Sequence, residues 1–269
     1  MKIYKNYDEE PEDIFLPLTE KLYSELYTLE MDNYSADIPF YQRHLPASGN
    51  ILEIGCGSGR VCRQLAGPQR IITAFDISLS MVTKARDTSV DCCHFLCMDM
   101  LNMAFSAPFD SVIIPYNTLN LLPCRDDILC CLRQCADCLT SSGRLCLQLY
   151  LPTGKIMQQR GKTFQFQIVD RPEGGKIIKE VLRKYISSSE SIEIEERFRI
   201  RPMTKEQENK DYNHYYTLSA LSFATWLDLF RQAGFILQNS YGSYDFDPFT
   251  AYDHSTLLAV LHKPEIISG

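Results

Sequence analysis

Three glycines at alternate positions, Gly55, Gly57 and Gly59, form the stretch of this sequence that is best suited to hold a small ligand. They follow a short apolar run, residues 51–54, that is typical of a buried strand, and a helical pattern begins after Arg60. Glycines let the backbone turn sharply and approach a ligand closely, and the free N–H groups of the next helix can bind a polar or anionic group. The spacing G-x-G-x-G differs from the dinucleotide fingerprint G-x-G-x-x-G, so an NAD-dependent oxidoreductase is a weaker alternative.

Carboxylates accompany three of the apolar runs. Glu53 lies inside the run before the glycine turn, Asp76 ends the second run, and Asp99 follows the third. An acceptor at the position of Asp76 can hold the two hydroxyls of a ribose. The alternative is that Asp76 or Ser78 only caps the next helix.

With Glu53 in front of it, the glycine turn resembles the first motif of the class I S-adenosylmethionine-dependent methyltransferases. The segment Asp76-Ile77-Ser78 followed by Met81 is similar to the second motif of that family. Residues 109–122 resemble the fourth motif of its bacterial small-molecule members, which include sugar N-methyltransferases. The resemblance spans roughly residues 50–262. It implies S-adenosyl-L-methionine as the cofactor and S-adenosyl-L-homocysteine as its product.

The same resemblance implies a set of cofactor-binding residues. In the family, an acid at the position of Asp99 approaches the adenine amino group, and Met100 would pack on the ring. An N-terminal helical segment caps the cofactor through an aromatic side chain, for which Tyr27 and Tyr34 are candidates; the alternative is that both only pack or face solvent. The implied set, with Tyr27 as its cap, is Glu53, Gly55, Cys56, Gly57, Gly59, Arg60, Asp76, Ile77, Met81, Asp99, Met100, Pro115, Tyr116 and Tyr27.

Candidate catalytic residues come from the fourth motif and from the C-terminal region. Transfer of a methyl group from a sulfonium needs alignment and desolvation, and it needs a base where the acceptor carries a proton. The resemblance puts Tyr116 and Asn117 beside the reacting methyl group, and His254 is a third candidate. Two further candidate bases are His214 and Tyr244, although a structural role is the commoner one for a histidine. Related sugar N-methyltransferases have a histidine where this chain has Leu121, so its role is not carried over.

The order of apolar runs and helical patterns predicts an α/β fold. We expect a Rossmann-like, doubly wound, seven-stranded and mostly parallel sheet that ends in an antiparallel hairpin, residues 235–242 and 255–262. Ligands of such a sheet bind at the carboxyl ends of its strands. The other expected strands are 50–55, 70–76, 93–98, 109–115 and 143–151, and the expected helices are 59–66, 79–87, 125–140 and 222–233.

Three parts of one domain are predicted. Residues 1–48 form an N-terminal helical cap, and residues 49–151 together with 221–269 form the methyltransferase core. Residues 152–220 show strand-like alternation and resemble the antiparallel insertion that covers the active site in this methyltransferase group. The insertion is too short and too embedded in the core to be an independent domain.

Composition limits the possible partners. The chain has 269 residues, 45% hydrophobic and 23% charged, and a net charge of −7, which argues against a phosphate-backbone binder. No signal peptide or apolar run of the ~20 residues needed to cross a bilayer is expected. The eleven cysteines therefore predict a cytoplasmic protein with reduced thiols that act as small core residues. Cys135-x-x-Cys138 has metal-ligand spacing but lacks a second pair, so no metal is expected.

We therefore expect an S-adenosylmethionine-dependent methyltransferase (EC 2.1.1.-) that acts on a small molecule, as a monomer or homodimer, without nucleic-acid or membrane partners. A non-catalytic cofactor-binding regulator is one alternative, motivated by Leu121. An RNA or protein methyltransferase is another, and the acidic net charge weighs against RNA.

Overall fold

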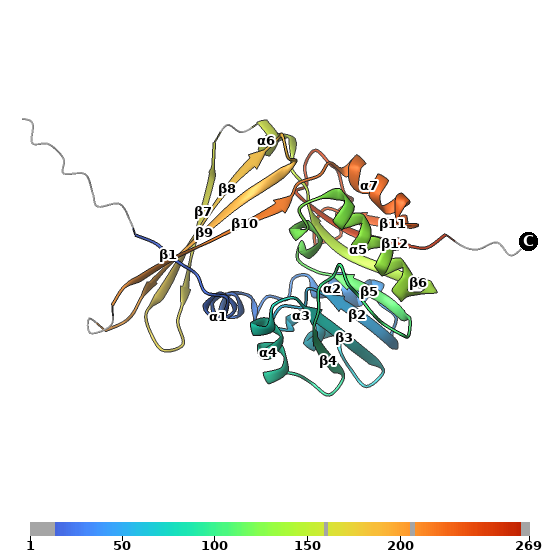
Figure 1. Ribbon diagram of the computed structural model, residues 1–269, viewed down its shortest axis with the longest axis horizontal. Coiled ribbons are helices and arrows are strands. Elements are labelled where there is room, and N and C mark those ends of the chain that lie inside the picture. The colour runs from blue at the N-terminus through green and yellow to red at the C-terminus, as the bar shows by residue number, and fades with distance from the viewer. Residues whose placement is uncertain (1–13, 159–160, 205–207, 265–269) are drawn as a thin grey trace, which may run out of the picture.

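A computed structural model describes residues 14–158, 161–204 and 208–264, and it contains two sheets (Figure 1). The larger sheet has seven strands in the order β11-β12-β6-β5-β2-β3-β4. The five strands from β6 to β4 are parallel, whereas β12 pairs antiparallel with both β6 and β11. Its strands are β2 (Gly49–Ile54), β3 (Arg70–Asp76), β4 (Cys93–Cys97), β5 (Phe109–Ile114), β6 (Leu139–Tyr150), β11 (Ile236–Tyr241) and β12 (Thr256–His262).

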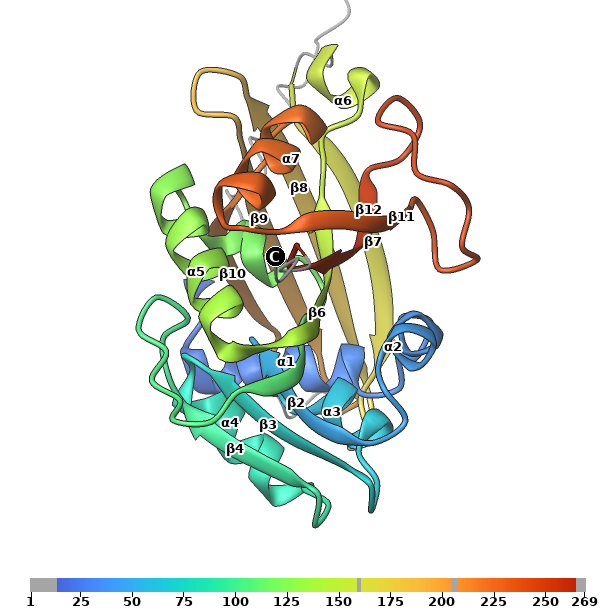
Figure 2. The same ribbon diagram turned by 90° about the vertical axis from the view of Figure 1, so that its right-hand side faces the viewer.

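Helices cover both faces of this sheet, as a doubly wound fold requires. On one face, α5 (Arg125–Cys138) and α7 (Phe223–Gln232) lie side by side and bury Cys131, Cys135 and Trp226 against the strands (Figure 2). A second buried cluster takes its helical residues from α2 (Ile38–His44), α3 (Arg60–Leu65) and α4 (Leu79–Asp87). The expected fold class is thereby confirmed.

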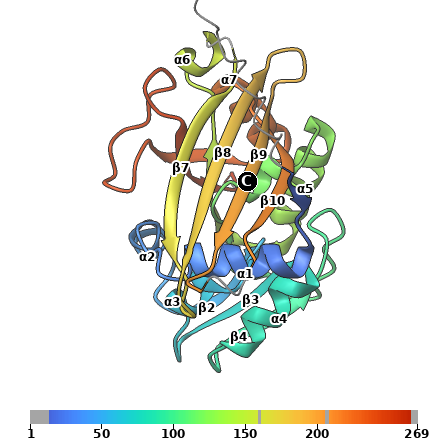
Figure 3. The ribbon, with the colours of Figure 1, turned by 90° about the vertical axis from the view of Figure 1, so that its left-hand side faces the viewer.

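The smaller sheet has the order β1-β10-β9-β8-β7 and is antiparallel except for the parallel pair β1–β10. The helix α1 (Glu20–Met31) crosses it and packs Leu26 against Ile177 and Phe198 (Figure 3). The strands are β1 (Leu16–Pro17), β7 (Thr163–Asp170), β8 (Lys176–Ile186), β9 (Ser191–Arg201) and β10 (Lys210–Ser219).

One asparagine joins the two sheets. Asn120 is fully buried in the 3-10 helix η1 (Thr118–Leu121), which follows β5. Its Nδ2 donates to the carbonyls of Tyr150 (3.0 Å) and Ser219 (2.7 Å), and its Oδ1 accepts from the Tyr150 N–H (3.0 Å). Tyr150 ends β6 of the large sheet, and Ser219 ends β10 of the small sheet. The chain therefore leaves the large sheet at Tyr150 and leaves the small sheet at Ser219, and the Asn120 side chain bonds both residues.

Some element boundaries differ from the expectation. The strand β6 begins at Leu139, not at residue 143, because Leu139 already pairs with Phe109 before the register shifts. The helix α5 accordingly ends at Cys138. Three short elements were not predicted: β1, η1 and α6 (Gly154–Gln158). The division into cap, core and insertion stays a prediction, and residues 1–13 and 265–269 of it lie outside the described residues.

All eleven cysteines are free thiols, and none of the helices in the described part of the chain is both long and apolar enough to cross a membrane.

Candidate active site

The three glycines of the turn between β2 and α3 are needed for different reasons. All have positive φ angles, 71°, 54° and 79° for Gly55, Gly57 and Gly59. A Cβ on Gly55 would lie 2.2 Å from the Thr118 Cγ2, and one on Gly59 would lie 3.0 Å from the Phe95 ring. The first and third glycines therefore serve close packing inside the fold. At Gly57 the nearest atom is the Tyr27 Cε1, 3.6 Å from an added Cβ, so this residue borders open space under the Tyr27 ring.

Asp76 connects the end of β3 to this turn. Its Oδ2 accepts a hydrogen bond from the Gly57 N–H (2.9 Å), and its Oδ1 accepts from the Ser78 N–H (2.9 Å). Burial raises the pKa of Asp76, against the lowering effect of these backbone donors. The N-cap of α4 is Ser78, whose Oγ accepts from the Met81 N–H (3.2 Å). The capping role that could have explained Asp76 thus belongs to Ser78.

The other predicted adenosine contacts lie around the end of β3 and after β4. The Ile77 side chain is 71% exposed, Met81 is buried, and Met100 packs against the core. The Asp99 Oδ1 accepts from the Leu101 N–H (2.9 Å) within its own turn. The roles of these four residues as cofactor contacts stay predictions.

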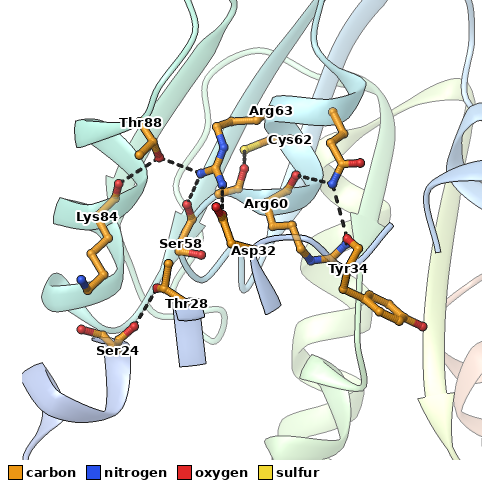
Figure 4. A network of polar contacts seen from close by, with 12 residues as sticks. Ser24, Thr28, Asp32, Tyr34, Ser58, Arg60, Cys62, Arg63, Lys84 and Thr88 are labelled. Carbon is orange, nitrogen blue, oxygen red and sulfur yellow. Dashed lines mark hydrogen bonds and ion pairs between the residues drawn. The ribbon is translucent and has the colours of Figure 1, made fainter. Parts of the chain in front are cut away.

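Arg60 holds the segment after α1 against α3. Its Nη atoms bond both carboxylate oxygens of Asp37 (2.7 and 2.6 Å), and its Nη1 also donates to the Tyr34 carbonyl (2.7 Å). Neither side chain of this ion pair is more than 7% exposed. Arg63 adds a bond to Asp32 (2.6 Å), as Figure 4 shows. The Arg60 guanidinium therefore positions Tyr34, a role that the sequence did not indicate.

Glu53 is a buried acid below the glycine turn. It is 1% exposed, and its Oε2 has no hydrogen-bond partner among the described residues. Burial raises its pKa to about 8, although Arg60 acts in the opposite direction. An unpaired oxygen in such a place is costly unless a ligand or a proton satisfies it.

A cavity of about 610 Å³ is lined by Tyr27, the residue whose ring lies nearest to Gly57 of the turn. Both sheets and α1 contribute to its wall, so residues far apart in the sequence meet there. Tyrosine is its most frequent lining residue: Tyr23, Tyr27, Tyr34, Tyr116, Tyr150, Tyr185, Tyr216 and Tyr244. Its charged lining residues within the described ranges are Glu30, Lys179, Arg183 and Glu196.

The fourth-motif loop brings Tyr116 and Asn117 to this cavity. Their φ angles are 51° and 63°, which is strained for non-glycine residues and typical of functional sites. The Asn117 Oδ1 accepts from the Gln148 Nε2 (3.3 Å), and the Tyr244 hydroxyl donates to the Gln148 Oε1. Burial raises the pKa values of Tyr116 and Tyr244, so both phenols are neutral near pH 7 and can donate hydrogen bonds. The Pro115 carbonyl accepts from Thr118 within the loop.

Three charged residues that line the cavity form a network, in which Lys179 and Glu196 are buried and Glu30 is partly buried. The Lys179 Nζ lies 2.7 Å from the Glu30 Oε2 and 2.8 Å from the Glu196 Oε1. Burial opposes ionisation of Glu196, but contacts with His214 and Lys179 lower its pKa overall. The His214 ring packs against Tyr23, with 4.3 Å between the ring centroids. Glu30, Lys179 and Glu196 were not predicted as site residues.

His254 lies in a turn before β12. Its Nδ1 accepts from the Thr250 N–H (3.1 Å), and it is not among the residues that line the cavity, although Ser255 and Thr256 are. Its catalytic role stays a prediction. Leu121, in the position of the family's histidine, is 49% exposed at the end of η1.

Comparisons with known proteins find similarity in sequence and in fold. A family model described as "Methyltransferase domain" matches residues 51–143. The curated protein YqeM of Bacillus subtilis (strain 168) is 33% identical over 88 residues, which cover 32% of this chain and 36% of that protein. The match therefore spans about a third of the length of this relative.

Solved structures share the fold. An S-adenosylmethionine-dependent methyltransferase from Clostridium acetobutylicum ATCC 824 has a TM-score of 0.72 at 14% identity, covering 90% of this chain and 98% of that chain. The CcbJ methyltransferase from Streptomyces caelestis also has a TM-score of 0.72, at 17% identity, covering 92% and 100%. DesVI from Streptomyces venezuelae has a TM-score of 0.71 at 14% identity, covering 90% and 97%.

Proposed function

We propose that this chain, which carries a methyltransferase domain and has the fold of S-adenosylmethionine-dependent methyltransferases, transfers a methyl group to a small-molecule acceptor. The observation that carries the proposal is the position of the cavity, which is bordered by Tyr27 of α1, the residue nearest to Gly57, and by the strained loop at Tyr116 and Asn117. Its volume of about 610 Å³ falls in the range of small-molecule sites, about 300–1,000 Å³. This size favours a small acceptor over RNA or a protein.

The residues at the turn fit S-adenosylmethionine. Gly57 leaves backbone open to a ligand, and Glu53 has an unpaired buried oxygen. In the proposal, Asp76 accepts hydrogen bonds from the ribose hydroxyls, and Tyr27 covers the cofactor. Asp99, Ile77, Met81 and Met100 surround the adenine. When bound, the cofactor supplies an activated methyl group on a positively charged sulfur.

The loop residues would align the acceptor. Tyr116 and Tyr244 are neutral phenols, so they can hold a nucleophile by hydrogen bonds but are poor bases near pH 7. Asn117 is oriented by Gln148 and offers an amide beside them. Alignment and exclusion of water are then the main contributions of this chain to catalysis. The free thiols support the cytoplasm as the proposed location.

Calorimetric titration with S-adenosylhomocysteine, on wild type and on Asp76→Ala, tests the proposal first. We expect wild type to bind and the variant to lose about 1–3 kcal/mol of binding free energy, because a partly buried hydrogen-bond acceptor is removed. Asp91→Ala, which removes an exposed carboxylate from the turn before β4, is the matched control and should bind like wild type. Absence of binding by folded, ligand-free wild type would contradict the proposal.

A screen of acceptors with S-adenosylmethionine follows, read as S-adenosylhomocysteine release. Turnover of any small acceptor would support the enzyme. Normal cofactor binding without turnover on a broad panel would instead favour the non-catalytic regulator.

A further inference from the structure

Two cations line the cavity on the same strand, and their surroundings differ. Lys179 is 8% exposed and is neutralised by Glu30 and Glu196, which both lie within 2.8 Å of its Nζ. Arg183 has no ion pair with any residue in the described part of the chain. Its polar side-chain contact is a hydrogen bond from Nη1 to the Gln165 Oε1 (3.1 Å). Among the described residues of the cavity wall, Arg183 is thus a cation whose charge is not balanced by a neighbouring carboxylate.

The strand register explains why the two cations are separated. Lys179 and Arg183 lie on the same face of β8, because residues two and four apart point the same way, and about 13 Å of strand separates them. Arg183 pairs with Thr163 on β7 and with Ile194 on β9, which in turn pairs with Tyr216 on β10. No position in this row carries an acid. The row is therefore positively charged, whereas the row of Glu196 is not.

Two tyrosines, Tyr150 and Tyr216, line the cavity together with Arg183. Burial raises the pKa of Tyr150 to about 12, and the positive charge of Arg183 opposes this change. Burial likewise raises the pKa of Tyr216, and Arg183 again acts in the opposite direction. The Tyr150 hydroxyl is buried and has no hydrogen-bond partner among the described residues. A neutral phenol with an unpaired O–H and a guanidinium that line the same cavity are a donor set suited to an anion.

We propose that Arg183, with Tyr150 and Tyr216 beside it, binds an anionic group of the acceptor, either a carboxylate or a phosphate. The inference rests on the proposed function, because it assigns a substrate class to the same cavity. It makes Arg183 a specificity-determining residue. Tyr150 lies two residues after Gln148 on β6, so the anionic group would be bound near the loop that holds Asn117.

The test uses small anions as probes. Wild type saturated with S-adenosylhomocysteine is titrated with inorganic phosphate and separately with acetate, at constant ionic strength set by potassium chloride, and binding is followed by NMR. We expect saturable binding of at least one probe in the millimolar range. Arg183→Gln should weaken it about tenfold or more, since a charge-assisted, fork-like contact is lost. The probe that binds more tightly distinguishes a phosphate from a carboxylate.

Lys184→Gln is the matched control. Lys184 is exposed, is next to Arg183 on β8, and points to the opposite face, so its removal should change probe affinity less than twofold. Gln165→Glu is a second test that keeps the arginine: the new carboxylate would pair with Arg183 and should abolish probe binding. This nearly isosteric change also serves if Arg183→Gln does not fold.

Three results would overturn the inference: no saturable binding of either probe to wild type, equal affinity in Arg183→Gln, or an equal loss in Lys184→Gln. The titration is also performed on the ligand-free protein. Failure of wild type to bind S-adenosylhomocysteine would contradict the proposed function, and the anion result would still be read independently.

Discussion

The glycine turn and the inner face of the small sheet are built in opposite ways. At the turn, a few consecutive residues and their backbone form the site, with Gly57 and Asp76 joined by one hydrogen bond. At the small sheet, the site is made by single side chains from α1, β8, β9 and β10. The residues of the turn are close together in the sequence and form a short motif. The residues at the small sheet come together only when strands that are far apart in the sequence pair.

This difference predicts which amino-acid substitutions each of the two regions can tolerate. A backbone site tolerates few substitutions at its glycines, whereas each side chain of the small sheet can be exchanged on an unchanged ladder of strands. We therefore expect changes at the turn to affect cofactor binding and stability, and changes at the small sheet to affect acceptor choice.

The largest effect is predicted for Glu53 and pH. Its pKa of about 8 in the folded protein, raised by burial, means that the folded state keeps a proton that the unfolded chain loses above about pH 4.5. The free energy of unfolding should thus fall as pH rises from about 5 to 8, by up to about 4 kcal/mol. Glu53→Gln removes this titrating group, so the free energy of unfolding of the variant should depend less on pH. Urea denaturation at several pH values measures it.

Glu25→Gln provides the control for this measurement, because Glu25 is exposed on α1 and should leave the pH dependence unchanged. If the free energy of unfolding had the same pH dependence in wild type and in Glu53→Gln, Glu53 would not be buried as described. The turn could then no longer be contrasted with the small sheet as a site formed by backbone.

Asn120→Ala is expected to have the second largest effect. The substitution removes three buried hydrogen bonds at the junction of the sheets and should lower the free energy of unfolding by about 2–3 kcal/mol. We expect S-adenosylhomocysteine affinity to change less than twofold, while anion binding by Arg183 weakens. Asn50→Ala, at an exposed position of β2, is the control for stability. Equal losses of affinity for S-adenosylhomocysteine and for the anion would argue that the glycine turn and the small sheet do not act separately.

Gly57→Ala should have the smallest effect on stability. The added Cβ has room, 3.6 Å from Tyr27, so the cost is the left-handed backbone, about 1 kcal/mol. Cofactor affinity should fall more than tenfold, because the methyl group would fill space that a ligand needs. Gly67→Ala, where nothing lies within 4 Å, should leave calorimetric affinity unchanged. Unchanged affinity in Gly57→Ala would remove Gly57 from the proposed site.

The sequence predicted the large sheet well because its signals are local. Residues 51–54 form an apolar run directly before the glycines, and β3 ends at Asp76 as expected. The junction was missed, because Asn120 lies in a four-residue 3-10 helix without periodicity and bonds residues 30 and 99 positions away. Lys179 and Arg183 lie in a stretch whose sequence indicated only the alternating pattern of a strand. Their residue types did not reveal that Lys179 forms ion pairs and that Arg183 does not pair with a carboxylate of the described chain.

The junction at Asn120 has a consequence for the history and engineering of the fold. Since the excursion between Tyr150 and Ser219 starts and ends at one side chain, its two ends are already adjacent. A segment with adjacent ends can be lengthened, shortened or replaced as a cassette without moving the strands on either side. The strands β7 to β10 of the small sheet lie within this excursion, so a foreign sheet grafted between these two residues would present a new acceptor surface to the proposed methyl donor.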